Sequence, residues 1–175
     1  MSKKLGIIQS RGLGDICIAL PIAKHYHDEG WEILWPICQE FMASVKDTAP
    51  WVKWIPIPTD QQGRFFYDEP MVRLKNFKVD ETLCLYQALS GHPELAAAPW
   101  FQIQKFDEYK YTQAGVSFRK KWTLADCIER NVEREQRLYD RVVKNPNYAV
   151  VHLEGSSYKC SADLSNIPED WQIIN

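Results

Sequence analysis

The apolar positions in the first third of the chain alternate between short continuous runs and one helical segment. Leu5–Gln9 is a short apolar run typical of a buried parallel strand. Ile16–His27 carries apolar residues at helical spacing, and Trp31–Trp35 is a second apolar run. This order of strand, loop, helix and strand predicts the opening of a doubly wound parallel sheet in an α/β protein of the Rossmann-like kind.

The alternation continues along the rest of the chain. Gln39–Asp47 is expected to form a short helix, Trp51–Ile57 a third strand broken by Pro56, and Asp80–Tyr86 a fourth strand. The region from Gln87 to Trp122 is rich in aromatic residues and has no clear period. Its tyrosines, Tyr109 and Tyr111, could stack on a sugar ring or pack in the core.

A second α/β region is predicted near the C-terminus. Asn131–Asn145 has an Asn cap, acids in the first turn and an apolar stripe, which together predict a helix. Tyr148–His152 and Trp171–Asn175 are predicted strands. We therefore expect a first domain over residues 1–145 and the incomplete beginning of a second domain over residues 146–175.

The residues best suited to chemistry lie between the first strand and its helix, in the sequence Arg11-Gly12-Leu13-Gly14-Asp15. Gly12 and Gly14 permit a close approach of ligand to backbone, and a helix N-terminus favours anions. We expect Asp15 to be the capping residue and Pro21 to lie near the helix start. A carboxylate at this edge of the sheet can act as a general base, or it can serve only as a cap.

The same glycines open a dinucleotide-binding pattern, but the rest of that pattern is missing. Its third glycine position is occupied by Cys17. The acidic residue that would bind a ribose hydroxyl is absent from the end of the second strand, Leu34–Ile37. These departures disfavour a dinucleotide site.

The run from Lys4 to Pro21 resembles the N-terminus of glycosyltransferase family nine, the ADP-heptose lipopolysaccharide heptosyltransferases. Trp31–Trp35 and Trp51–Ile55 also resemble strands of that family. The resemblance implies a GT-B fold of two facing Rossmann-like domains, of which this chain would hold the acceptor side. It further implies metal-independent, inverting transfer from a nucleotide sugar without a cofactor, with Asp15 as the catalytic base.

The segment from His152 to Lys159 resembles the entry to the family's donor domain. Ser156, Ser157 and Lys159 are the candidates there for binding the donor diphosphate, although Glu154 adds a negative charge nearby. The alternative is an ordinary solvated turn.

For an anionic acceptor, further candidates join Arg11, Gly12 and Gly14. Arg119 and Lys120 belong to a basic cluster, and Arg64 lies in an aromatic loop. Each of these cations could equally belong to a solvated surface.

Composition narrows the function classes. The chain has 21 Lys and Arg against 23 Asp and Glu, a net charge of -2, which argues against broad nucleic-acid binding. The five cysteines are scattered without a CxxC pair, and no apolar run is long enough to cross a bilayer, so we expect a cytoplasmic protein.

Three functions remain open. The first is a glycosyltransferase, or a fragment of one, acting on a glycan or lipopolysaccharide-type acceptor. The second is a catalytically inactive sugar- or nucleotide-binding module of the same fold, and the third is a DNA-modifying glycosyltransferase. A complete donor domain would need roughly a hundred residues more than follow Tyr148, so we expect little or no transferase activity from this chain alone.

Overall fold

The computed structural model describes residues 2–60, 62–87, 89, 103–154 and 159–174. The chain divides into two compact units, Met1–Glu129 and Arg130–Asn175, and each is described by itself. The sequence-based division at residues 145 and 146 concerns acceptor and donor functions, and it stays a prediction.

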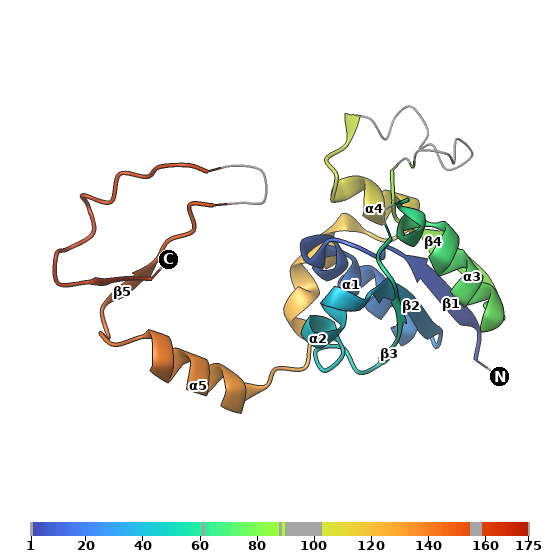
Figure 1. Ribbon diagram of the computed structural model, residues 1–175, viewed down its shortest axis with the longest axis horizontal. Coiled ribbons are helices and arrows are strands. Elements are labelled where there is room, and N and C mark those ends of the chain that lie inside the picture. The colour runs from blue at the N-terminus through green and yellow to red at the C-terminus, as the bar shows by residue number, and fades with distance from the viewer. Residues whose placement is uncertain (1, 61, 88, 90–102, 155–158, 175) are drawn as a thin grey trace. The chain divides into compact units, whose positions relative to one another are not determined.

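A parallel four-stranded sheet forms the centre of the first unit (Figure 1). The strands lie in the order β3 (Val52–Ile57), β2 (Glu32–Cys38), β1 (Lys4–Ile8) and β4 (Glu81–Cys84). Parallel pairing along the whole sheet confirms the predicted α/β class. The chain winds from β1 toward β3 in one direction and returns to place β4 on the other side of β1, so the β1–β4 border is a topological switch point.

Helices cover both faces of this sheet. Neighbouring residues of β1 point to opposite faces, so they pack against different helices. Leu5 and Ile7 belong to the larger core cluster, which includes residues of α1 (Leu13–Asp28). Ile8 belongs to a second cluster with Leu74 of α3 (Asp68–Asn76). The apolar run of β1 is therefore buried on both faces, as expected for a central parallel strand.

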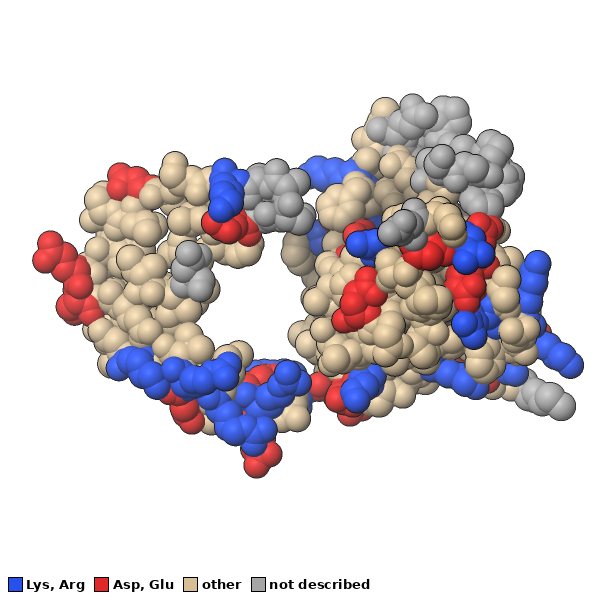
Figure 2. Space-filling view, viewed as in Figure 1, with Lys and Arg blue, Asp and Glu red and all other residues tan. Residues whose placement is uncertain are grey.

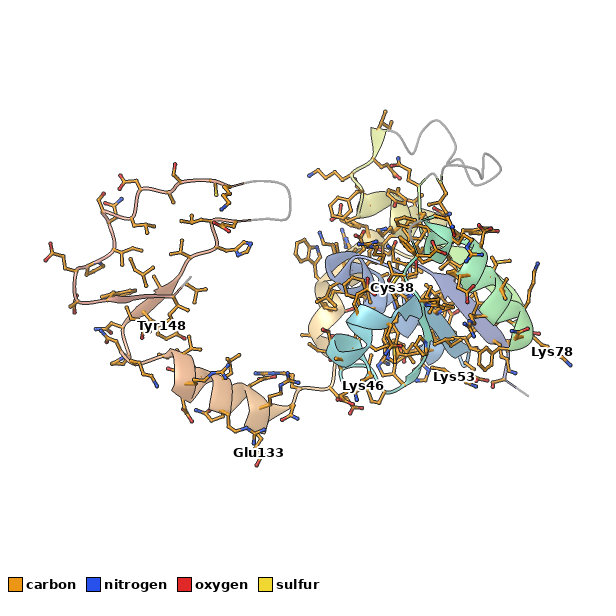
Figure 3. All side chains as sticks on the ribbon, viewed as in Figure 1. Cys38, Lys46, Lys53, Lys78, Glu133 and Tyr148 are labelled. Carbon is orange, nitrogen blue, oxygen red and sulfur yellow. The ribbon has the colours of Figure 1, made fainter. Side chains whose placement is uncertain are left out.

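Short elements complete the first unit. They are η1 (Gln39–Phe41), α2 (Met42–Val45), η2 (Arg64–Phe66), α4 (Glu108–Gln113) and η5 (Phe118–Cys127). Tyr111 of α4 and Cys127 of η5 belong to the larger core cluster, so core packing is confirmed for Tyr111. In Figure 3, Cys38 lies in the interior of this unit, whereas Lys46 and Lys78 lie toward its margin.

The helix after β1 begins earlier than the sequence predicts. Gly12 is the N-cap residue of α1, with a φ of 81°, and Asp15 lies in the first turn. The prediction of Asp15 as the capping residue is therefore wrong, because the positive φ of Gly12 lets the helix start at Leu13. Pro21 lies in the helix interior rather than near its start, and the helix continues through it.

β3 also differs from its prediction. It continues through Pro56, which pairs in register with Ile37 of β2. A proline is tolerated there because, among the described strands, β3 is an edge strand and only β2 pairs with it. The predicted break at Pro56 is wrong for this reason.

The second unit contains α5 (Val132–Val142) and a parallel pair, β5 (Tyr148–Val150) and β6 (Gln172–Ile174). The predicted cap is confirmed, since the Oδ1 of Asn131 accepts from the backbone N–H of Arg134 at 2.9 Å. Tyr139 packs edge-on against Tyr148, with ring centroids 6.1 Å apart. Among the described residues, every buried hydrophobic one belongs to the first unit.

The first unit displays charges of both signs on the face drawn in Figure 2, where basic and acidic residues are interspersed. In the described ranges, no helix combines the length and the apolar character that a membrane crossing requires.

The close contact between β1 and α3 leaves no room for a side chain at Gly6. A Cβ at Gly6 would lie 2.7 Å from the Cδ1 of Leu74, a fully buried side chain. We expect Gly6→Ala to lower the free energy of unfolding by about 1–3 kcal/mol through overpacking, measured by urea denaturation. In a Leu74→Ala background the added methyl has room, so the same substitution should cost less. Equal costs in both backgrounds would contradict this packing account.

Candidate functional site

A pocket opens at the switch point, where the chain leaves the carboxyl ends of β1 and β4. Its volume is about 340 Å³, at the lower end of the range for small-molecule sites, about 300–1,000 Å³. Ile8 and Cys84 are paired at the ends of these strands, so the segments that follow them emerge together. The lining residues are Gln9, Arg11, Gly12, Asp15, Phe66, Tyr86, Gln87, Phe106, Tyr109 and Lys110.

Asp15 brings a carboxylate to this pocket from the first turn of α1. Its Oδ1 lies 3.2 Å from the Nζ of Lys110, and its side chain is 37% exposed. A Cβ at Gly12 would lie 2.6 Å from the Oδ2 of Asp15. The carboxylate therefore lies against a backbone position that only glycine can occupy without a clash, and part of it remains accessible to a ligand.

Lys110 lies beneath the pocket, and its side chain is only 2% exposed. Its ammonium donates to the Oε1 of Gln9 at 2.6 Å and to the carbonyl of Leu85 at 3.1 Å. It also donates to the hydroxyl of Tyr109 at 3.2 Å. Burial lowers the pKa of Lys110, and the neighbouring Asp15 carboxylate opposes that shift.

Tyr86 fixes the turn that follows β1. Its hydroxyl accepts from the backbone N–H groups of Ser10 at 3.0 Å and Arg11 at 3.2 Å. Phe66 packs edge-on against the Tyr86 ring, with centroids 5.4 Å apart. Burial raises the pKa of Tyr86 to about 12, and the hydrogen bonds that its oxygen accepts oppose this shift.

Arg11 supplies positive charge at the pocket. Its guanidinium lies over the ring of Phe65, 5.1 Å from the centroid, and its side chain is exposed. Within the part of the chain that the structure describes, Arg11 forms no ion pair with a carboxylate. A planar cation held against an aromatic ring in this way is suited to bind an anionic group of a ligand.

The pocket brings together only some of the residues predicted for acceptor binding. Arg11 and Gly12 line it together with Asp15, whereas Gly14, Arg64, Arg119 and Lys120 do not. The guanidinium of Arg64 pairs with Asp60 at 2.9 Å instead.

The predicted basic cluster belongs to η5. Lys120 places its Nζ 3.3 Å from the Nδ1 of His25, near the other end of α1. His25 follows Asp15 by ten positions in α1, a rise of about 15 Å. The structure thus places Lys120 away from the pocket.

The predicted donor-binding residues belong to the second unit. Lys159 is exposed, and its Nζ lies 2.9 Å from the Oε1 of Glu154. Ser156 and Ser157 lie outside the described residues. Their role in binding a diphosphate stays a prediction, and the carboxylate of Glu154 would compete with phosphate for Lys159.

Lys110 is the main functional candidate that the sequence did not reveal. It lies between Tyr109 and Tyr111 in the aromatic region without a clear period. A lysine flanked by two aromatic residues on a short helix is a signal that could have been noticed. Its partner Gln9 was assigned to the strand, although its side chain turns toward the same ammonium.

Among the described residues, no group of three or more His, Cys, Asp or Glu side chains is placed to hold a metal ion. Comparison with family models, with curated proteins and with solved structures finds no match to this chain. Function must therefore be argued from the pocket and from the motif that leads into it.

The pKa values predict a late step in the alkaline titration of the tyrosines. Burial raises the pKa of both Tyr86 and Tyr109 to about 12, compared with an ordinary value near 10. Folding favours their neutral forms, so this contribution to stability is present below about pH 10 and is lost as the pH rises toward about 12. Phenolate absorbance should therefore rise in two steps in the folded chain and in one step, near pH 10, in the denatured chain.

Tyr86→Phe should reduce the late step by one phenol and leave the early step unchanged. A late step of unchanged amplitude would show that Tyr86 ionises like an exposed phenol.

Proposed function

We propose that the first unit is the acceptor-binding half of a nucleotide-sugar-dependent glycosyltransferase of the GT-B type, with Asp15 as the general base. The observation that carries this proposal is the partly exposed carboxylate of Asp15 in an aromatic-lined pocket at the switch point of a parallel sheet. Open α/β sheets bind their ligands at such a point. The resemblance of Lys4–Pro21 to family nine supports the same assignment.

The composition of the pocket suits a sugar with an anionic substituent. Phe66, Phe106 and Tyr109 supply aromatic surface of the kind that packs against the apolar face of a sugar ring. Arg11 would bind a phosphate or carboxylate on the acceptor. Within the described residues, the Oδ2 of Asp15 accepts no hydrogen bond, so this oxygen can accept one from a sugar hydroxyl.

In the proposed reaction, the acceptor hydroxyl attacks the anomeric carbon of the donor sugar and transfers its proton to Asp15. The new oxygen–carbon bond forms as the bond to the diphosphate breaks, and the nucleoside diphosphate leaves with the electron pair. Attack from the face opposite the leaving group inverts the anomeric configuration. Ser156, Ser157 and Lys159 would bind the donor diphosphate in this proposal, and the reaction would take place in the cytoplasm.

A sugar-binding module without catalysis is the second candidate. The ion pair between Asp15 and Lys110 favours it, because such a pair can hold a carboxylate in place for binding alone. An assay with nucleotide sugars and an acceptor that binds tests this chain for transfer. Release of nucleoside diphosphate supports the first candidate. Binding without release fits both the module and an acceptor-binding half that does not transfer by itself.

The proposal predicts that the chain binds hexose or heptose monophosphates and that Asp15→Asn weakens this binding. The lost hydrogen bond to a charged group is worth about 1.5–3 kcal/mol, equivalent to about a 10–100-fold higher Kd. Calorimetric titration of wild type and variant measures the difference, and circular dichroism checks the fold. If the wild-type chain binds none of these compounds, or if both proteins bind them equally well, the proposal is wrong.

A matched pair of glycines tests the geometry around Asp15. Gly12→Ala forces an unfavourable φ and pushes a methyl group against the carboxylate, so binding of the same monophosphates should weaken about tenfold or more. Gly14→Ala is the control, because a Cβ there meets no atom within 4 Å. Equal loss in the two variants would mean that the position of the carboxylate does not matter.

A further inference from the structure

Lys110 is anchored by groups that do not depend on Asp15. Gln9 and Leu85 follow β1 and β4, and their oxygens accept from the ammonium at 2.6 and 3.1 Å. The hydroxyl of Tyr109 lies 3.2 Å away. These neutral acceptors can engage all three N–H donors of a lysine, so the ammonium has a fixed position before the carboxylate is considered.

Asp15 is the member of the pair with freedom to move. Its side chain is 37% exposed, compared with 2% for Lys110. A short side chain at the surface of a helix can adopt several rotamers. The buried ammonium selects the rotamer in which Oδ1 points down to Nζ and Oδ2 lies beside Gly12.

We propose that Lys110 is a positioning residue that holds the carboxylate of Asp15 in the pocket, oriented for the hydroxyl of the acceptor. This inference rests on the proposed function for the identity of the acceptor. The contact between Lys110 and Asp15, however, can be tested without any ligand.

The energetic cost of this lysine supports a role beyond packing. An apolar side chain would fill the same space without desolvating a charge. Among the described residues, the titratable groups besides Asp15 that influence this region are Tyr109 from α4, and Cys84 and Tyr86 from β4 and the segment after it. Burial raises the pKa of all three, which keeps them neutral, so within the described ranges Asp15 supplies the negative charge beside the ammonium.

The first experiment follows the titration of Lys110 by NMR of its Cε in the full chain, in wild type and in Asp15→Asn. Because the carboxylate opposes the effect of burial, its removal should lower the pKa of Lys110 further. Lys121 is a matched internal control, since it pairs with Asp107 and does not line the pocket. An unchanged titration of Lys110 in Asp15→Asn would overturn the inference.

The second experiment compares Lys110→Met with Lys121→Met. Each variant removes one partly or fully buried lysine from an ion pair, but only the first releases Asp15. We expect Lys110→Met to weaken the binding of hexose or heptose monophosphates about tenfold, equivalent to about 1.4 kcal/mol, with little change for Lys121→Met. Equal binding by Lys110→Met and wild type would overturn the inference.

A negative result in one experiment has a different meaning from a negative result in the other. If Lys110 responds to Asp15→Asn but no monophosphate binds wild type, the contact stands and the proposed function is wrong. If monophosphates bind but Lys110 does not respond, the proposed function stands and the positioning role is wrong. The NMR measurement also retains the native lysine, so it remains decisive even if Lys110→Met does not fold.

Discussion

The parallel pairing of β1 with β4 is the constraint on which the rest of the first unit depends. It places the ends of two strands that are far apart in the sequence next to each other, with Ile8 opposite Cys84. The segments after both strands then contribute to one pocket, which is lined by Gln9, Arg11, Gly12 and Asp15 from the first segment and by Tyr86 and Gln87 from the second. Lys110 contacts both segments, through the Oε1 of Gln9 and the carbonyl of Leu85.

The sequence predicted the framework of this unit because each strand has a strong local signal. Leu5–Ile8 and Ile33–Trp35 are apolar and buried on both faces, so a short continuous run identifies each of them. Asp15 was identified for a similar reason, since it follows a glycine-rich turn at the end of the first strand. Its predicted role as a cap was wrong, because a glycine with positive φ can take the N-cap position without a side-chain hydrogen bond. Its role as a base stays a prediction.

The second half of the pocket could not be predicted in the same way. Lys110 approaches Gln9 across 101 positions of sequence, and no local periodicity reports such a contact. Arg119 and Lys120 were predicted to bind the acceptor because they are adjacent in the sequence and form a basic cluster. Sequence alone does not show which element this cluster packs against. The packing of η5 against α1 places Lys120 beside His25 instead. The basic cluster in the sequence therefore did not identify residues of the pocket, whereas the residues that follow the first strand did.

In the second unit, the side chain of Gln172 connects β6 to the end of α5. Its Oε1 accepts from the backbone N–H groups of Lys144 and Asn145, and its Nε2 donates to the carbonyl of Val142. One residue of β6 thus holds the end of α5 through three hydrogen bonds. Because the ends of the intervening segment are already held together, lengthening it would cost only about 0.6 kcal/mol for each doubling. The segment between β5 and β6 is therefore expected to tolerate insertions at little cost in stability.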